Sequence, residues 1–245
     1  MKFMKFVTLG LFLLIVVGLV WLPASAQETL TYGDTVEGEI TDAAFRFEYQ
    51  FEGSADDIIV IHMKDGVDFG DLDSPELLLL DAGGNLIADT TEAFTYGETT
   101  LITQLSAAGA YTIVATRTDG QAGDSVGPFV LTLFQPEVID TGAKLRSEFS
   151  SEDDPKYYSI SIDAAFNLNY SKLRGDLSPQ ISLHALDPDA PGITEELATV
   201  SGQLNHIVLG TFEDQAPYIV IVEQALFDFH FTEVTAEFNL FVTSQ

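Results

Sequence analysis

The sequence predicts an all-β protein made of two tandem antiparallel β-sandwich domains of the jelly-roll kind. Three observations predict it: apolar residues recur with a period of two rather than about 3.6, turn-forming residues separate the apolar runs, and the same series of runs occurs twice. Pro136 marks the boundary between the copies, because proline cannot continue a strand ladder. We therefore expect three parts: an export segment (1–26), a first domain (27–135) and a second domain (136–245).

The strands of the first copy can be assigned in order. Aromatic residues at every second position from Phe45 to Phe51 place one face of a strand in a core. A continuous apolar strand follows at Ile58 to Met63, and Leu77 to Leu80 ends at an Asp-Ala-Gly-Gly-Asn turn that predicts a hairpin. Later strands begin near Leu101, Tyr111 and Phe129. No segment has the apolar period of an amphipathic helix.

The second copy repeats this order. The strand from Tyr157 corresponds to that from Phe45, Ile181 to Leu186 corresponds to Leu77 to Leu80, and Phe238 to Val242 corresponds to Phe129 to Leu133. About eight short strands per copy, bounded by turns, are typical of a jelly-roll-like sandwich.

The first 26 residues have the pattern of a signal peptide. Lys2 and Lys5 precede an apolar run, and Pro23 is followed by the small residues Ala24 to Ala26, so we expect cleavage before Gln27. The alternative is a retained membrane anchor, because the run approaches the ~18 apolar residues that span a bilayer. Cleavage would leave a bacterial protein with no membrane span that is secreted, held at the cell surface or periplasmic.

Composition narrows the partners. The chain has no cysteine, so stability must come from apolar cores without disulfides. Its 38 acidic residues outnumber 10 basic ones, and such a surface repels nucleic acid and anionic lipid. Cations, or glycans bound through carboxylates, fit better. The alternative is that the acidic residues only keep the protein soluble and protect its strand edges.

Three motifs of the first copy resemble a known family: Gly33 to Gly38, Leu72 to Asn85 and Ala108 to Val114. Together they resemble the bacterial pre-peptidase C-terminal domain. The second copy resembles it less, because the Asp81 to Asn85 turn has no counterpart there. The resemblance implies a jelly-roll sandwich that is usually attached to secreted proteases or other hydrolases and serves substrate binding, secretion or folding. In this sequence we expect two such modules without a catalytic domain.

Gly123 to Gly127 reads Gly-x-Ser-x-Gly, the pattern of hydrolase nucleophiles, and it is also similar to the serine segment of chymotrypsin-type proteases. A hydrolase elbow needs a strand before the serine and a helix after it, whereas Ser125 follows a turn-rich segment and precedes a strand. His62, the histidine upstream of it, lies on an apolar strand. We therefore expect no catalytic residue and a hairpin loop at Ser125, with a serine hydrolase as the least favoured alternative.

A loop with four aspartates is the candidate metal site. The residues are Asp65, Asp68, Asp71 and Asp73. Carboxylates and carbonyls converging in a flexible loop suit Ca²⁺, and no other cofactor is expected. The alternative is that Asp and Gly are there for their turn propensity. The matching segment of the second copy carries Lys172 and Arg174, so we expect calcium in the first copy alone.

Aromatic side chains in a polar loop are the candidate ligand platform. Phe94 and Tyr96 lie outside the clear strands and could stack on a sugar. Phe227, Phe229 and Phe231 alternate, which indicates a core face instead.

The sequence thus predicts a secreted, non-catalytic binding or accessory module pair for an extracellular protein or glycan, stabilised by calcium. The alternative is an accessory subunit or chaperone-like partner of a separate secreted hydrolase.

Overall fold

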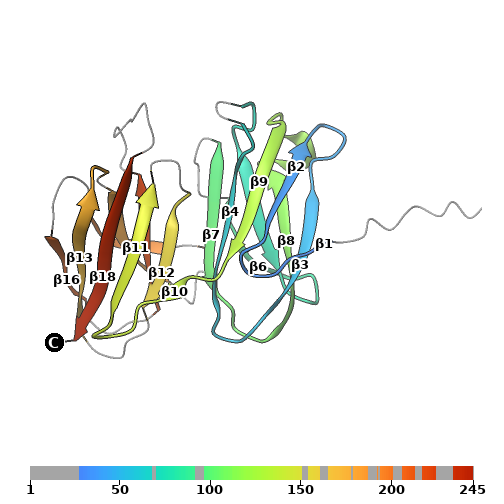
Figure 1. Ribbon diagram of the computed structural model, residues 1–245. Coiled ribbons are helices and arrows are strands. Elements are labelled where there is room, and N and C mark those ends of the chain that lie inside the picture. Colours follow the sequence, from blue (N-terminus) through green and yellow to red (C-terminus); the bar gives the residue numbers. More distant parts are fainter. Residues whose placement is uncertain are drawn as a thin grey trace, which may run out of the picture.

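The computed structural model describes residues 28–67, 70–91, 97–150, 154–160, 165–177, 179–186, 192, 194–200, 206–212, 217–224 and 234–244. These residues form β-strands and one short 3-10 helix, η1 (Gly120–Ala122), with no α-helix among them (Figure 1). The predicted all-β sandwich fold is therefore confirmed.

The first half of the chain forms two facing sheets. Their strands are β1 (Glu28–Thr29), β2 (Thr35–Ile40), β3 (Phe47–Gly53), β4 (Ile58–Asp65), β5 (Pro75–Leu80), β6 (Leu86–Asp89), β7 (Glu98–Gln104), β8 (Gly109–Arg117) and β9 (Gly127–Phe134). Sheet 1 has the order β1-β3-β8-β5-β6 and sheet 2 the order β2-β9-β4-β7. All pairs are antiparallel except β1 with β3, which is parallel.

The second half repeats this topology strand for strand. Its strands are β10 (Glu137–Val138), β11 (Lys144–Ser150), β12 (Lys156–Ile160), β13 (Phe166–Gly175), β14 (Pro179–Leu186), β15 (Thr194–Val200), β16 (His206–Phe212), β17 (Tyr218–Gln224) and β18 (Thr235–Ser244). Sheet 3 has the order β10-β12-β17-β14-β15 and sheet 4 the order β11-β18-β13-β16. We keep residues 27–135 and 136–245 as the proposed domain bounds.

Each sandwich has its own core. Between sheets 1 and 2 the core includes Tyr49 and Phe51, while Glu48 and Gln50 alternate outward from the same strand. Between sheets 3 and 4 the largest fully buried side chains are Phe149, Phe166, Tyr218 and Phe238. The period-two alternation read from the sequence thus separates core from outward positions.

A third apolar cluster joins the sandwiches. Val60 and Ile102 from the outward face of sheet 2 pack against Tyr157, Leu186 and Ile219 of the second sandwich. We call this contact the seam. It places β4 and β7 opposite sheet 3, so the four sheets form one stack with sheet 1 at one end and sheet 4 at the other (Figure 1).

Candidate functional site

The seam combines its apolar cluster with polar contacts. Lys64 from β4 forms an ion pair with Asp154, which precedes β12. Nδ1 of His62 lies 2.9 Å from the Thr100 hydroxyl on β7, and its Nε2 lies 4.0 Å from the Glu98 carboxylate. Lys64 thus has a partner in the other sandwich and Nδ1 of His62 has one on the neighbouring strand, whereas the buried Nε2 of His62 has no hydrogen-bond partner among the described residues.

Burial shifts the pKa values of three seam groups. It lowers the pKa of His62, outweighing the charges of Glu98 and Asp154 that favour protonation. It raises the pKa of Glu223 on β17, and the charge of Glu98 across the seam raises it further. It also raises the pKa of the Tyr157 phenol above its usual range. Burial therefore favours the neutral form of His62, and the charge of the Glu98 carboxylate acts on Glu223 of the other sandwich.

A cleft of about 520 Å³ opens at one side of the seam. The first sandwich contributes Gly33, Thr35, Thr132, Phe134 and Gln135, and the second contributes Glu137, Ser147, Asp154, Pro155, Lys156, Tyr157 and Tyr158. Its volume lies in the usual range of ligand sites, roughly 300–1,000 Å³. Both sandwiches are needed to form it.

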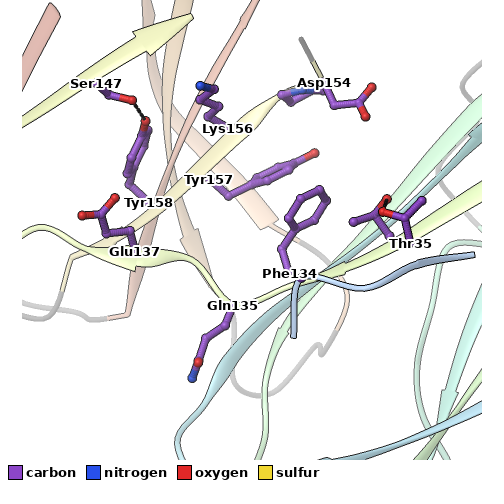
Figure 2. A pocket seen from close by; sticks show the side chains of 12 residues that line it. Thr35, Phe134, Gln135, Glu137, Ser147, Asp154, Lys156, Tyr157 and Tyr158 are labelled. Atoms are coloured by element: carbon purple, nitrogen blue, oxygen red, sulfur yellow. Dashed lines mark hydrogen bonds between the residues drawn. The ribbon is translucent and has the colours of Figure 1, made fainter. Parts of the chain in front are cut away.

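The cleft has an aromatic centre and a polar rim. Figure 2 shows Phe134 and Tyr157 facing each other across the seam, and their ring centroids lie 5.6 Å apart. On one side the Tyr158 hydroxyl donates to the Ser147 hydroxyl at 2.7 Å. On the other, the hydroxyls of Thr35 and Thr132 lie 3.0 Å apart. An apolar floor with hydroxyls around it suits a ligand that has both an apolar surface and hydrogen-bonding groups.

Charges of both signs border the cleft. Asp154 is held by Lys64, and Glu137 begins the second sandwich. The Lys156 ammonium donates to the backbone carbonyl of Glu148. No single charge dominates, so the lining favours a polar ligand of low net charge.

Ser125 is buried in the first sandwich and hydrogen-bonded to its backbone. The serine is buried, and its hydroxyl accepts a hydrogen bond at 3.1 Å from the backbone N–H of Ser74. The buried Arg117 side chain donates to the carbonyl of Ser125 at 3.0 Å and to that of Gly120 at 2.8 Å. His62 lies instead in the seam, beside Thr100. The structure therefore does not bring this serine and this histidine together.

The acidic loop is described in part. Asp65, Asp71 and Asp73 are described, whereas Asp68 lies outside the described residues. One Asp65 carboxylate oxygen accepts from the Val67 N–H at 3.1 Å. No three His, Asp or Glu side chains in the described part of the chain lie close enough together to hold a metal ion. The calcium site stays a prediction.

Several other predictions concern residues that the structure does not describe. The signal peptide (1–26), the Phe94 and Tyr96 platform and the segment from Phe227 to Phe231 lie outside the described residues. In the described part, no helix is long and apolar enough to cross a membrane.

Sequence reasoning missed the cleft. The strand Tyr218 to Val222 reads Tyr-Ile-Val-Ile-Val, which is apolar on both faces and signals that its sheet is covered on both sides. That signal indicates a seam but not which sheet covers it. Phe134 and Tyr157 come together only once sheet 2 docks on sheet 3.

No protein-family model and no curated protein matches the chain. Among solved structures, the pre-peptidase C-terminal domain of a collagenase from Bacillus anthracis is 14% identical, with 44% of this chain and 93% of that chain covered and a TM-score of 0.34. A protein from Eubacterium rectale described as secreted is also 14% identical, with 84% and 72% covered and a TM-score of 0.31. A Sulfolobus turreted icosahedral virus structure is 11% identical, with 86% and 59% covered and a TM-score of 0.23. Likeness at this level does not identify a family, and the resemblance of the first copy to the pre-peptidase C-terminal domain stays a prediction.

Proposed function

We propose that this protein is a secreted, non-catalytic binding module whose two sandwiches jointly hold a short segment of an extracellular protein or glycan. The observation that carries the proposal is the cleft lined by the packed rings of Phe134 and Tyr157, which neither sandwich forms alone. Its aromatic floor and hydroxyl rim offer stacking and hydrogen bonds without an arranged nucleophile and base.

Ser125 and His62 support the non-catalytic assignment. The Ser125 hydroxyl is engaged by the Ser74 amide, and the His62 ring is buried in the seam with a lowered pKa. A nucleophile needs a base within hydrogen-bond reach, and these two residues are engaged in different parts of the first sandwich.

The test is a binding screen with a blocking variant. Purified protein is passed over immobilised polysaccharides and over denatured extracellular proteins such as gelatin. Thr35→Trp places a large side chain at the cleft from an exposed strand position, and we expect it to weaken binding at least about tenfold. Thr29→Trp, on the exposed strand β1, is the matched control and should bind as wild type does. Equal binding by both variants would show that the ligand does not bind in the cleft.

Export is tested separately. Mass spectrometry of protein from the culture medium of a producing bacterium should find a mature chain that begins at Gln27. A full-length chain in the membrane fraction would show the retained anchor instead.

A further inference from the structure

The outward face of sheet 4 carries an ordered array of polar side chains at one end of the stack. Its three cross-strand rows are Lys144, Phe241, Asn169 and Val208; then Arg146, Asn239 and Ser171; then Glu148, Glu237 and Arg174. Their chain neighbours, such as Leu168, Phe238 and Leu240, lie in the core of the second sandwich. Because side chains alternate along a strand, the three rows point away from that core.

Basic side chains outnumber acidic ones on this face of a strongly acidic protein. Lys144, Arg146 and Arg174 lie on it with Glu148 and Glu237, whereas the whole chain has 10 basic residues against 38 acidic ones. The opposite end of the stack differs: the outward face of sheet 1 carries glutamates such as Glu48 and Glu52. The two ends therefore differ in their balance of basic and acidic side chains.

Glu237 organises the two arginines. Its side chain is 9% exposed and forms ion pairs with Arg146 and Arg174, whose side chains are 65% and 75% exposed. Hydrogen bonds and charges from both guanidiniums lower the pKa of Glu237 even though burial opposes this. Held in this way, the guanidiniums lose less freedom when an anion binds their remaining N–H groups.

The same face offers groups for uncharged parts of a ligand. The Lys144 ammonium lies 5.3 Å from the centroid of the Phe241 ring. Nδ2 of Asn169 donates to the Phe241 carbonyl at 3.3 Å, which ties β13 to β18 beneath this ring. Asn239 and Ser171 lie in the same row as Arg146, between the row of the Phe241 ring and the row of Arg174. Aromatic, amide and hydroxyl groups next to cations suit a carboxylated sugar, which has an apolar ring face, hydroxyls and a carboxylate.

We propose that the outward face of sheet 4 is a second binding site, separate from the cleft, for an acidic polysaccharide. Arg146 and Arg174 bind its carboxylates, and a sugar ring lies beside Phe241. A polymer with about one charge per sugar fits better than nucleic acid, whose charge spacing of about 1.7 Å along the duplex meets stronger repulsion from the rest of this acidic protein.

The test is calorimetry with polygalacturonate at low salt. Arg174→Gln should weaken binding about tenfold and Lys144→Ala about threefold, because each removes one charged contact. Arg46→Ala removes an exposed arginine of the first sandwich and should change nothing. Raising the salt to about 0.3 M should weaken wild-type binding several-fold, since screening acts on exposed charges.

Lys144→Ala keeps the test valid if Arg174→Gln unfolds, because Lys144 is exposed and lies outside the buried pairs of Glu237. Wild-type affinity in both variants would overturn the proposal, as would absence of binding to polygalacturonate, alginate and hyaluronate. Equal affinity for neutral dextran would rule out carboxylate recognition. Equal affinity for oligothymidylate would rule out the polysaccharide and show a general polyanion surface.

Discussion

Sheets 2 and 3 carry apolar side chains at positions where their counterparts, sheets 4 and 1, carry polar ones. Val60 pairs with Phe134 as Asn167 pairs with Thr243, and Tyr157 and Ile219 of sheet 3 occupy the positions of Glu48 and Thr112 of sheet 1. Matching hydrogen bonds align the two copies: the N–H of Gly33 donates to the carbonyl of Leu133, and the N–H of Gly142 donates to that of Val242. In this repeated topology, a few outward residues decide which faces dock and which face water.

The largest expected effect comes from placing a charge in the seam. Val60 is fully buried there, so Val60→Asp should destabilise the docked state by about 3 kcal/mol or more. Asn167→Asp, at the equivalent position of sheet 4, should cost less than about 0.5 kcal/mol. Urea denaturation gives both values, and small-angle X-ray scattering should show separated sandwiches for Val60→Asp alone. Similar losses in the two variants would mean that the faces do not differ.

The second-largest effect is expected at Arg117, a buried arginine of the first sandwich whose equivalent in the second is Gln224. It pairs with Pro75 as Gln224 pairs with Pro179, yet it is 1% exposed and its guanidinium donates to two backbone carbonyls. Arg117→Met leaves the carbonyls of Gly120 and Ser125 without this donor, and we expect a loss of about 2–4 kcal/mol in the first sandwich. Exposed Arg46→Met is the control, measured by the same denaturation. An unchanged midpoint for Arg117→Met would show that these bonds are not needed.

The polar ends can be converted into docking faces. Glu48→Tyr with Thr112→Ile copies sheet 3 onto sheet 1, and Asn167→Val with Thr243→Phe copies sheet 2 onto sheet 4. The combined variant should form larger assemblies than wild type at tens of micromolar, because head-to-tail faces generate open stacks. Light scattering coupled to size exclusion measures this. A variant with the wild-type mass would show that other features keep the ends apart.

The seam should respond to pH through two opposing groups. Because the pKa of His62 is lowered, its contribution to the free energy of unfolding is present above about pH 6.5 and is lost as the pH falls through the lowered value. The raised pKa of Glu223 means that its contribution is present below the ordinary glutamate value and is lost as the pH rises through the raised one. His62→Gln should therefore be more stable relative to wild type in acid than at neutral pH. Glu223→Gln should be more stable relative to wild type at neutral pH than in acid. Denaturation at about pH 5 and 7.5 tests both signs.

The smallest expected effect is that of calcium. The first copy has Asp65, Asp71 and Asp73 where the second has Lys172 and Arg174. Calcium should raise the wild-type melting temperature by a few degrees and leave that of Asp71→Ala unchanged. Identical wild-type curves with and without calcium would leave the aspartates with a turn-forming role.

Local patterns sufficed to predict the strands. The alternation from Phe45 to Phe51 and the turn after Leu80 each depend on neighbours in sequence, and both match β3 and the hairpin of β5 and β6. In that turn Gly84 adopts a φ of 78° and its N–H donates to the carbonyl of Asp81 at 2.9 Å. Such conformations are encoded within a few residues.

The cleft and the sheet 4 array could not be predicted in the same way. Tyr157 alternates with core residues as any outward residue does, and its partner Phe134 comes from a different sheet. Arg146 and Arg174 are separated by many residues and meet only through Glu237. These sites depend on register and docking across long separations in the chain, which residue periodicity does not report.

The connection between the sandwiches has a consequence for how strong the seam must be. β9 ends at Phe134 and β10 begins at Glu137, so Gln135 and Pro136 alone lie between them. Such a tether gives the two faces an effective concentration in the millimolar range or above, and a contact too weak to hold two separate proteins would still stay closed. The seam can therefore accommodate the repulsion between Glu98 and Glu223 and leave an open cleft at its side, where a free dimer would need a larger and drier interface.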